Sequence, residues 1–215
     1  MENFAKELIL KLLDEKKPSE YFRYLKRTSK LSFFPELLYL TITPQDNLWH
    51  PEGTVWEHTL MVLDVAAEIR HQYETEKDAL TYMLGTLCHD FGKPYTTIFK
   101  DGKIKSPIHD FYGIPPTKSF LKRIGVEEVS YEVCNYVLEH LKPMQLYKNR
   151  HNVSDSAIIR LNKRINIYDL CNIGMADHWG RTDEEAKNRI YPAGDWLLER
   201  YKQILENNRL SELSA

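Results

Sequence analysis

The sequence predicts an all-α protein with a metal site between its helices, and three observations lead to this prediction. Apolar residues recur at helical spacing through most of the 215 residues, whereas alternating, strand-like runs rarely exceed a few residues. Signals for helix starts and helix ends separate these runs. Several runs also place a histidine or an aspartate where the apolar face of a helix would normally carry a hydrophobic side chain.

Capping signals define the starts of several predicted helices. Thr54 with Glu57, and Thr182 with Glu185, have the spacing of a capping box, and Asp78 is expected to cap a further helix. The predicted helices, taken from these signals and from apolar periodicity, cover residues 3–14, 20–30, 35–41, 54–71, 78–89, 116–124, 127–141, 154–164, 167–179, 183–190 and 193–207.

One of these helices ends at the dipeptide His89-Asp90, because a glycine and a proline follow within four residues. The next segment, residues 95–115, is rich in glycine, proline and lysine, and we expect a small hairpin around Asp101-Gly102. Since this segment follows the His-Asp pair directly, it is the best candidate for a substrate-facing loop.

Composition and charge restrict the class of function. The chain has 29 basic and 31 acidic residues, a formal net charge of −2, and 42% hydrophobic residues. A strong nucleic-acid binder is not expected, because such proteins carry a marked positive charge. One stretch is locally basic, with Lys142, Lys148, Arg150, His151, Arg160, Lys163 and Arg164. We interpret this stretch as a solvated face, so that tRNA is only a weakly supported partner.

Cysteine usage and hydropathy indicate a cytoplasmic protein without a membrane anchor. The three cysteines are far apart in apolar, helix-like stretches, as is typical of reduced core residues. The N-terminal residues lack the apolar run of a signal peptide, and no stretch approaches about 18 uninterrupted apolar residues. In the absence of a linker or repeat we expect a single domain over 1–215, with the metal-site core at about 48–180 and flanking helices at 1–41 and 183–207.

The candidate metal ligands are His58, His89, Asp90 and Asp177. They come from three predicted helices, and each lies on or beside the apolar face of its helix. A buried carboxylate without a partner costs several kcal/mol, which a divalent cation would offset. Imidazole and carboxylate together suit Mn, Fe, Co, Ni or Zn better than Ca, and Mg is a further candidate. Such a ligand set leaves coordination positions for water and substrate.

Each of these residues also has an ordinary structural interpretation. A single inward histidine, such as His58 or His140, is more often a hydrogen-bonded core residue than a metal ligand. Asp177 could instead pair with Arg181. The convergence of three helices on one set of ligand-type side chains favours the metal site over these alternatives. No such convergence supports the other histidines, which are His50, His71, His151 and His178.

The order and spacing of His58, His89-Asp90 and Asp177 resemble the H…HD…D pattern of the HD superfamily of metal-dependent phosphohydrolases. The chain is more closely similar to the HD domain at the C-terminal end of bacterial CCA-adding enzymes, the tRNA nucleotidyltransferases. This similarity covers most of residues 33–201, in the segments FFPELLYLTITPQDNLWHPEGTVWEHTLMVLD, LGTLCHDFGKP, MADHWGRTDEE and YPAGDWLLERY.

The resemblance implies a helical bundle of the HD type around the metal. It also implies divalent-metal-dependent hydrolysis of nucleotide phosphoesters, namely 2′,3′-cyclic nucleotides, 2′-nucleotides or small phosphomonoesters. The nucleotidyltransferase head of those enzymes has a Gly-Ser turn followed by paired aspartates on a strand, and this sequence contains no similar segment. We therefore do not extend CCA addition to this chain.

Some HD proteins hold two metals through extra histidines between the HD pair and the final aspartate. His109 and His140 lie where the resemblance places those ligands, so that they and Asp90 are candidates for a second metal or for substrate contact. The fuller two-metal pattern has paired histidines at the later position, where this chain has Glu139-His140. We therefore expect one tightly held ion, and the choice between one and two ions stays open.

The candidate mechanism combines the metal with nearby charged side chains. A bound divalent ion lowers the pKa of its water from 15.7 toward about 7–9, which supplies a nucleophile near neutral pH. Asp90 is the candidate to accept the proton of that water, and Lys93 is the candidate to contact a phosphoryl oxygen. Alternatively, Lys93 is a solvated lysine at its helix end. Lys142 and Arg181 are further candidates for phosphate binding.

Two other functions remain open at this stage. A nucleotide triphosphohydrolase or cyclic-dinucleotide phosphodiesterase would use the same pocket, and release of triphosphate or of a linear dinucleotide would identify it. A non-catalytic RNA-binding module related to tRNA nucleotidyltransferases would bind tRNA tightly and with strong salt dependence, without hydrolysis.

Overall fold

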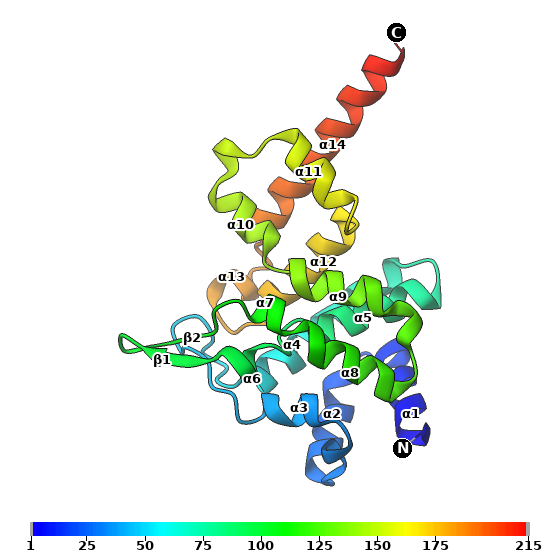
Figure 1. The fold of residues 1–215 in the computed structure, drawn as a ribbon, viewed down its shortest axis with the longest axis vertical. Coiled ribbons are helices and arrows are strands. Elements are labelled where there is room, and N and C mark those ends of the chain that lie inside the picture. The colour runs from blue at the N-terminus through cyan, green and yellow to red at the C-terminus, as the bar shows by residue number, and fades with distance from the viewer. Residues whose placement is uncertain (1, 214–215) are drawn as a thin grey trace.

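The computed structural model describes residues 2–213 and consists mostly of helices (Figure 1). The α-helices are α1 (Glu2–Asp14), α2 (Pro18–Arg27), α3 (Pro35–Leu40), α4 (Val55–Ile69), α5 (Glu76–Cys88), α6 (Lys93–Thr96), α7 (His109–Tyr112), α8 (Ile114–Ile124), α9 (Ser130–Glu139), α10 (Lys142–Lys148), α11 (Asp155–Asn162), α12 (Ile167–Trp179), α13 (Glu184–Lys187) and α14 (Pro192–Leu213). Single 3-10 turns lie at Lys30–Phe33, Arg70–Gln72, Glu127–Val129 and Arg150–Asn152.

The strands of the structure form one hairpin within the described residues. Strand β1 (Ile98–Lys100) pairs antiparallel with β2 (Lys103–Lys105), and the turn between them is Asp101-Gly102. Both turn residues have positive φ, which a glycine and an aspartate adopt more readily than most residues. The prediction of an all-α protein with one small hairpin is therefore confirmed.

Helices α4, α5 and α12 pack on one another at the centre of the molecule. Their buried sides are lined with aliphatic side chains, for example Leu60 in α4, Leu84 in α5 and Leu170 in α12. Helix α2 covers α4, α1 and α9 cover α5, and α8 lies against α9. Because the three central helices touch pairwise, polar side chains on their facing sides can meet at one point.

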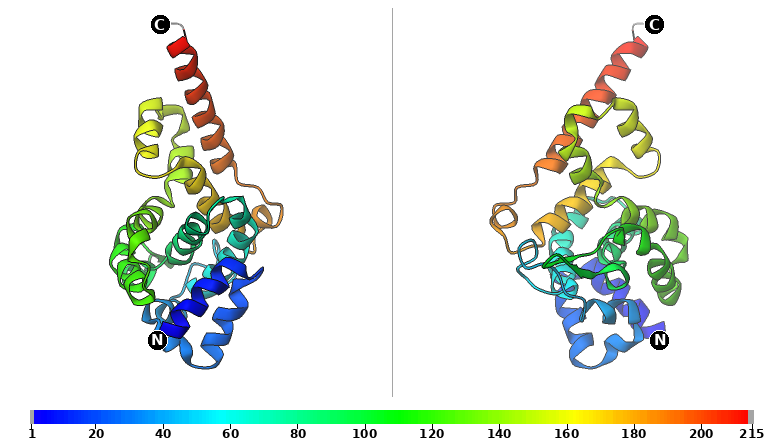
Figure 2. Two further views of the ribbon diagram at one scale, coloured as in Figure 1. Left: turned by 90° about the vertical axis from the view of Figure 1, so that its right-hand side faces the viewer. Right: turned by 60° about the vertical axis from the view of Figure 1, so that its left-hand side comes forward.

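Helix α14 lies at one end of the molecule (Figure 1). It packs against α10, α11 and α12, and its C-terminal half projects beyond the remaining helices (Figures 1 and 2). None of the helices in the described part of the chain combines the length and apolarity needed to cross a lipid bilayer.

Two of the predicted capping residues are wrong. Helix α5 is capped by Thr75, whose hydroxyl oxygen accepts the backbone N–H of Asp78 at 3.1 Å, so Asp78 lies inside the first turn. Helix α13 is capped by Asp183, which accepts the backbone N–H of Ala186 at 2.8 Å, in place of Thr182. In both cases a second residue of similar capping ability stands within three positions, and the pattern alone does not separate the two.

The ranges of several elements also differ from the prediction. Helices α6, α7 and α10 lie outside the predicted ranges, and with four to seven residues they are too short to show apolar periodicity. The predicted helix at 127–141 divides into a 3-10 turn and α9, and the helix predicted at 183–190 is only the four-residue α13. Helix α14 is longer than predicted, since it reaches Leu213.

Candidate metal centre

Helix α4 positions His58 in the centre of the molecule. The predicted cap is present, because the Thr54 hydroxyl accepts a backbone N–H of the first turn, and His58 follows in that turn with no exposed surface. Its Nδ1 lies 3.2 Å from the Gly180 carbonyl oxygen and 3.0 Å from a Glu52 carboxylate oxygen, so Nδ1 carries the proton of the neutral ring. The Nε2 lone pair then faces Oδ1 of Asp177 at 2.9 Å, an arrangement that a cation would stabilise.

His89 and Asp90 follow the last turn of α5 and are both buried. Nδ1 of His89 donates to the Thr86 carbonyl at 2.7 Å, which directs Nε2 toward Oδ2 of Asp90, 3.2 Å away. Nε2 of His89 and both oxygens of Asp90 have no hydrogen-bond partner among the described residues. Lys93 and His109 lie within ion-pair distance of Asp90 but make no hydrogen bond to it, so a divalent cation would satisfy these buried ligand atoms more fully.

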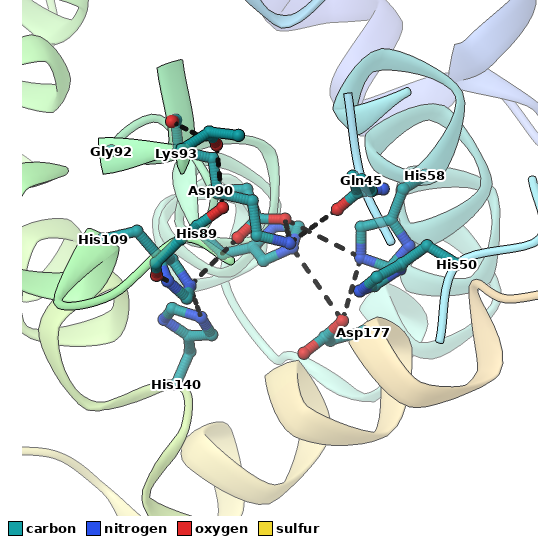
Figure 3. A network of polar contacts seen from close by, with 12 residues as sticks. Gln45, His50, His58, His89, Asp90, Gly92, Lys93, His109, His140 and Asp177 are labelled. Carbon is teal, nitrogen blue, oxygen red and sulfur yellow. Dashed lines mark hydrogen bonds and ion pairs between the residues drawn. The ribbon is translucent and has the colours of Figure 1, made fainter. Parts of the chain in front are cut away.

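The carboxylate of Asp90 lies between two groups of histidines (Figure 3). Its Oδ2 faces Nε2 of His89 and, at 3.9 Å, Nε2 of His58, while its Oδ1 is 3.3 Å from Nε2 of His109. The residues therefore form two groups that could each hold a metal ion and that share one carboxylate: His58, His89 and Asp90 in the first, and Asp90, His109 and His140 in the second. Asp177 adds a fourth ligand-type side chain to the first group.

His109 and His140 point their rings at each other with an Nε2–Nε2 distance of 3.2 Å. Nδ1 of His109 lies 2.8 Å from the Ser106 carbonyl, and Nδ1 of His140 lies 2.7 Å from the Val137 carbonyl. Each Nδ1 must carry a proton to donate to its carbonyl, so the neutral rings oppose two lone pairs. A cation, or a proton shared between the rings, would relieve this repulsion. The pair therefore fits a second metal position beside Asp90.

The protonation states of the cluster suit metal binding. Burial would raise the pKa of Asp90 and of Asp177, but the positive charges beside them outweigh burial and hold both pKa values well below the usual range. Burial, together with repulsion from neighbouring histidines, lowers the pKa of His140 to about 4. At neutral pH the cluster thus offers ionised carboxylates and a neutral His140, which are the forms that bind divalent metals. Burial lowers the pKa of His89, but the carboxylates of Asp90 and Asp177 outweigh burial and raise it, so metal binding at His89 would release a proton.

Lys93 points into the site from the first residue of α6. Its ammonium donates a hydrogen bond to the side-chain oxygen of Gln45 at 2.7 Å. The ammonium also lies 2.7 Å from Oδ2 of Asp90, where it forms an ion pair without a hydrogen bond. The side chain is 10% exposed. The alternative of a solvated lysine at a helix end is therefore wrong, because Lys93 is buried and its backbone N–H donates to the Asp90 carbonyl at 3.0 Å, which keeps it beside the His-Asp pair.

The two other candidate cations are placed differently. Arg181 lines the cavity in front of the cluster, with Nη2 3.5 Å from Oδ1 of Asp177. Lys142 is 39% exposed, and its ammonium lies 3.3 Å from the Gln145 side-chain oxygen and 4.0 Å from a Glu139 carboxylate oxygen. The structure thus brings Arg181 to the site and leaves Lys142 outside it.

The cavity has a volume of about 230 Å³, and most of the residues that line it are polar or charged. Side chains from both histidine groups, the loop before α4, the hairpin and α12 line it, namely those of Gln45, Asp46, Trp49, His50, Asp90, Lys93, Ile104, Ser106, His109, His140, Leu141, Asp177 and Arg181.

Two side chains that the sequence did not indicate, His50 and Glu52, extend the cluster. Nδ1 of His50 donates to Oε1 of Glu52 at 2.9 Å, and the same oxygen accepts from His58. Burial lowers the pKa of His50 to about 4. Both residues lie in an irregular loop, where no helical periodicity indicates an inward direction. The only available signal was their closeness in sequence to His58.

The remaining histidines lie away from the cluster. His178 is buried, but its Nε2 faces a Glu185 carboxylate at 3.1 Å and its ring packs beside Tyr191. His71 and His151 are exposed in 3-10 turns. These contacts place the ring of His178 away from the Asp90 carboxylate, although His178 follows Asp177 directly in α12.

Gly92 allows the chain after the His-Asp pair to approach His109. A Cβ at this position would lie 1.9 Å from the backbone oxygen of His109 and 2.6 Å from the backbone nitrogen of Gly113. We expect Gly92→Ala to lower the free energy of unfolding by about 1–3 kcal/mol, because backbone must move to admit the methyl group. It should also weaken metal binding, since that movement displaces His109. Thermal unfolding and metal titration measure the two effects.

Gly194→Ala is the matched control for this substitution. Its Cβ would lie 2.5 Å from the Tyr191 ring, far from the histidine pair, so it tests crowding without moving a ligand. It should reduce stability and leave metal affinity unchanged. Equal metal affinity in both variants would show that Gly92 has no part in positioning His109.

Comparison with known proteins identifies the family of this helical arrangement. The model of the family described as "HD domain" matches residues 55–172, which include both members of the His-Asp pair and end shortly before Asp177. A "Multifunctional CCA protein" of Mannheimia succiniciproducens is 28% identical over 206 residues, covering 92% of this chain and 47% of that protein. A protein of the same name from Pasteurella multocida is 27% identical over 210 residues, with the same coverage of 92% and 47%.

The chain spans about half the length of these curated relatives, so their name describes proteins with additional sequence. The family match extends over more than half of this chain and includes the segments that carry His58 and the His-Asp pair. The chain therefore belongs to the HD domain family and is distantly homologous to multifunctional CCA proteins.

Proposed function

We propose that the chain is a divalent-metal-dependent phosphohydrolase that acts on nucleotide phosphoesters, such as 2′,3′-cyclic nucleotides, 2′-nucleotides or small phosphomonoesters. The observation that carries the proposal is the group of buried atoms without hydrogen-bond partners at His89 and Asp90, next to a cavity that Asp90 lines together with His109, His140 and Asp177. Membership of the HD domain family supports the same chemistry.

The proposed metal ligands are His58, His89, Asp90 and Asp177. A divalent ion at this site supplies Lewis acidity, which lowers the pKa of coordinated water and offsets negative charge on phosphoryl oxygens. In His58 and His89, Nδ1 lies against a backbone carbonyl oxygen. This contact fixes the ring and leaves Nε2 available for a metal. Mixed imidazole and carboxylate ligands suit Mn, Fe, Co, Ni or Zn, with Mg as a further candidate.

A second ion at Asp90, His109 and His140 is also proposed. The sequence alone favours one tightly held ion, but the opposed lone pairs of His109 and His140 support a second cation position. Asp90, whose Oδ2 faces the first group and whose Oδ1 faces the second, would serve both positions, and a pair of divalent ions would offset charge on the attacking and leaving oxygens.

Lys93 is proposed to bind a phosphoryl oxygen of the substrate. It is a buried cation that lines the cavity beside Asp90, so its charge is weakly screened by water. We expect Lys93→Met to lower kcat/KM by about 10²-fold, the usual cost of one donor to developing charge, while metal content stays unchanged. Steady-state kinetics together with elemental analysis measure both quantities.

Lys142→Met is the control for the Lys93 variant, because Lys142 is an exposed lysine outside the cavity. We expect its activity to remain within about twofold of the unmodified protein, as for most surface substitutions. A large loss of activity in Lys142→Met, or none in Lys93→Met, would contradict the assignment of the phosphate contact to Lys93.

A panel of phosphoesters tests the proposed function. The protein loaded in turn with Mn, Co, Ni, Zn or Mg is incubated with 2′,3′-cyclic nucleotides, 2′- and 3′-nucleotides, nucleoside triphosphates and cyclic dinucleotides, and the products are separated. Hydrolysis of the first two classes supports the proposal. Release of triphosphate or of a linear dinucleotide, without activity on the monoesters, would assign the pocket to a different HD reaction. No hydrolysis, with tight and salt-sensitive tRNA binding in a filter assay, would favour the RNA-binding module.

A further inference from the structure

The cavity at the metal ligands is small, and an apolar groove lies beside it. At about 230 Å³ the cavity is below the range of about 300–1,000 Å³ that is usual for pockets holding a whole small ligand. It therefore suits a phosphoryl group, and the rest of a nucleotide must extend outward. The adjoining groove measures about 550 Å³ and is lined mainly by apolar side chains, including Tyr39, Ile42, Pro44, Tyr95, Phe99 and Ile104.

The groove and the cavity share a wall. Lys93 lines the cavity, and the two residues that follow it in the chain line the groove. In the same way Gln45 lines the cavity while Pro44 lines the groove, and Ile104 of β2 lines both. A substrate with its phosphoester beside Lys93 would therefore reach the groove by passing over this wall, which consists of α6, the Pro44-Gln45 segment and β2.

The groove displays aromatic rings to solvent. Phe99 is 77% exposed and Tyr95 is 54% exposed, and the Tyr95 ring meets Tyr39 edge to face with centroids 6.4 Å apart. Exposed aromatic residues gathered at one place are typical of a binding surface. Flat aromatic faces beside a site for phosphate suit nucleobases, which stack on such faces regardless of sequence.

The hairpin beside the groove carries positive charge on the face opposite Phe99. In the β1–β2 register Phe99 lies opposite Ile104, so these two apolar residues share one face of the hairpin. The three lysines of the strands occupy the opposite face; they are Lys100, Lys103 and Lys105. All three are exposed, and within residues 2–213 their ammonium groups have no ion-pair partner. Asp101 at the turn is the one carboxylate of the hairpin, which thus carries net positive charge.

We propose that the groove and the hairpin bind a single-stranded oligonucleotide whose terminal phosphoester enters the metal cavity. A base next to the terminal nucleotide stacks on Phe99 and Tyr95, and the strand then passes around the edge of the hairpin, where the lysines of the opposite face contact the backbone phosphates that follow. The hairpin projects from the body of the molecule beside α6, where it can reach along a bound strand (Figure 1). This inference rests on the proposed function for its reaction, and it adds a substrate class with more than one nucleotide.

Kinetics with matched substrates test the proposal. The ratio of kcat/KM for a tetranucleotide ending in a 2′,3′-cyclic phosphate to kcat/KM for the corresponding mononucleotide is measured in the full chain. We expect the tetranucleotide to be preferred by about tenfold or more, as one stacked base contributes. Phe99→Ala should remove this preference and leave the mononucleotide rate unchanged, whereas Phe99→Trp should retain it. Tyr131→Ala, which removes a 70% exposed aromatic ring from α9, should change neither value.

Binding without hydrolysis separates this inference from the proposed function. Fluorescence anisotropy is recorded with a labelled tetranucleotide that ends in a 3′-hydroxyl, at two salt concentrations. We expect Phe99→Ala to bind the tetranucleotide more weakly, and the variant with all three lysines changed to Gln to show a smaller salt dependence of binding. Both results would support oligonucleotide binding at the groove even if no ester is hydrolysed. Binding and substrate preference that are unaffected by these changes would overturn it. So would a dimer in light scattering that Phe99→Ala converts to monomer, because the groove would then be an interface between two copies.

Discussion

We expect Asp90→Ala to abolish metal binding and to reduce phosphoester hydrolysis by more than about 10³-fold, which exceeds the loss of a single transition-state donor. Asp90 is the residue shared by both ligand groups, since its two oxygens face His89 and His58 on one side and His109 on the other. Its removal deletes the central negative charge of the cluster and leaves Asp177 as the only carboxylate among the proposed ligands. Elemental analysis of the purified variant and a kinetic assay measure the two losses.

His178→Ala is the control for Asp90→Ala. His178 lies in α12 next to Asp177, but its ring contacts Glu185 and Tyr191. The variant should be less stable, because a buried side chain is lost, and should keep its metal content and most of its activity. Loss of metal in His178→Ala as complete as in Asp90→Ala would mean that the cluster is held together by packing rather than by metal ligation.

We expect His140→Ala to lower the metal content from two ions per chain toward one and to reduce the rate by orders of magnitude. The reason is the 3.2 Å contact between Nε2 of His140 and Nε2 of His109, in which both Nδ1 atoms are committed to backbone carbonyls. If His140 instead acted as a general acid beside a single ion, its loss would cost about 10²–10⁴ in rate and leave the stoichiometry unchanged. Metal titration by calorimetry distinguishes the two results.

His50→Ala provides a comparison from the same cavity. His50 lines the cavity, but it donates to Glu52 and lies outside the Asp90 group. Its removal should leave the second ion in place. A metal content of one in the unmodified protein, with no change in His140→Ala, would refute the second ion and leave the phosphohydrolase proposal standing.

Helical periodicity explains why much of the candidate site could be predicted from the sequence. A repeat of 3.6 residues fixes the direction of each side chain on a helix, so that His58, Asp177 and His140 could be assigned to inward faces. The helix-ending signals at Gly92 and Pro94 placed the His-Asp pair at the end of α5. Packing of α4, α5 and α12 then brings these positions together.

The parts that could not be predicted lie outside long helices. His50, Glu52 and Gln45 come from a loop, whose side-chain directions depend on tertiary contacts that no local pattern encodes. Lys93 reaches the cavity because the chain turns between α5 and α6. Helix α6 has only four residues, which is too short for a sequence pattern to reveal its direction. The sequence could not distinguish Thr75, the observed cap of α5, from Asp78, because the capping preferences of threonine and aspartate differ by only a few tenths of a kcal/mol.

The central claim is that the histidine and aspartate cluster binds a divalent transition metal. The most direct measurement is the metal content of the protein purified without chelator, followed by thermal unfolding before and after chelation. We expect a substantial fraction of Mn, Fe, Co, Ni or Zn in the purified protein, a lower Tm after chelation, and recovery of the Tm on adding the metal back, because a ligand that binds only the folded state stabilises it. A protein that contains no metal, and whose Tm does not rise with any of these ions, would contradict the claim.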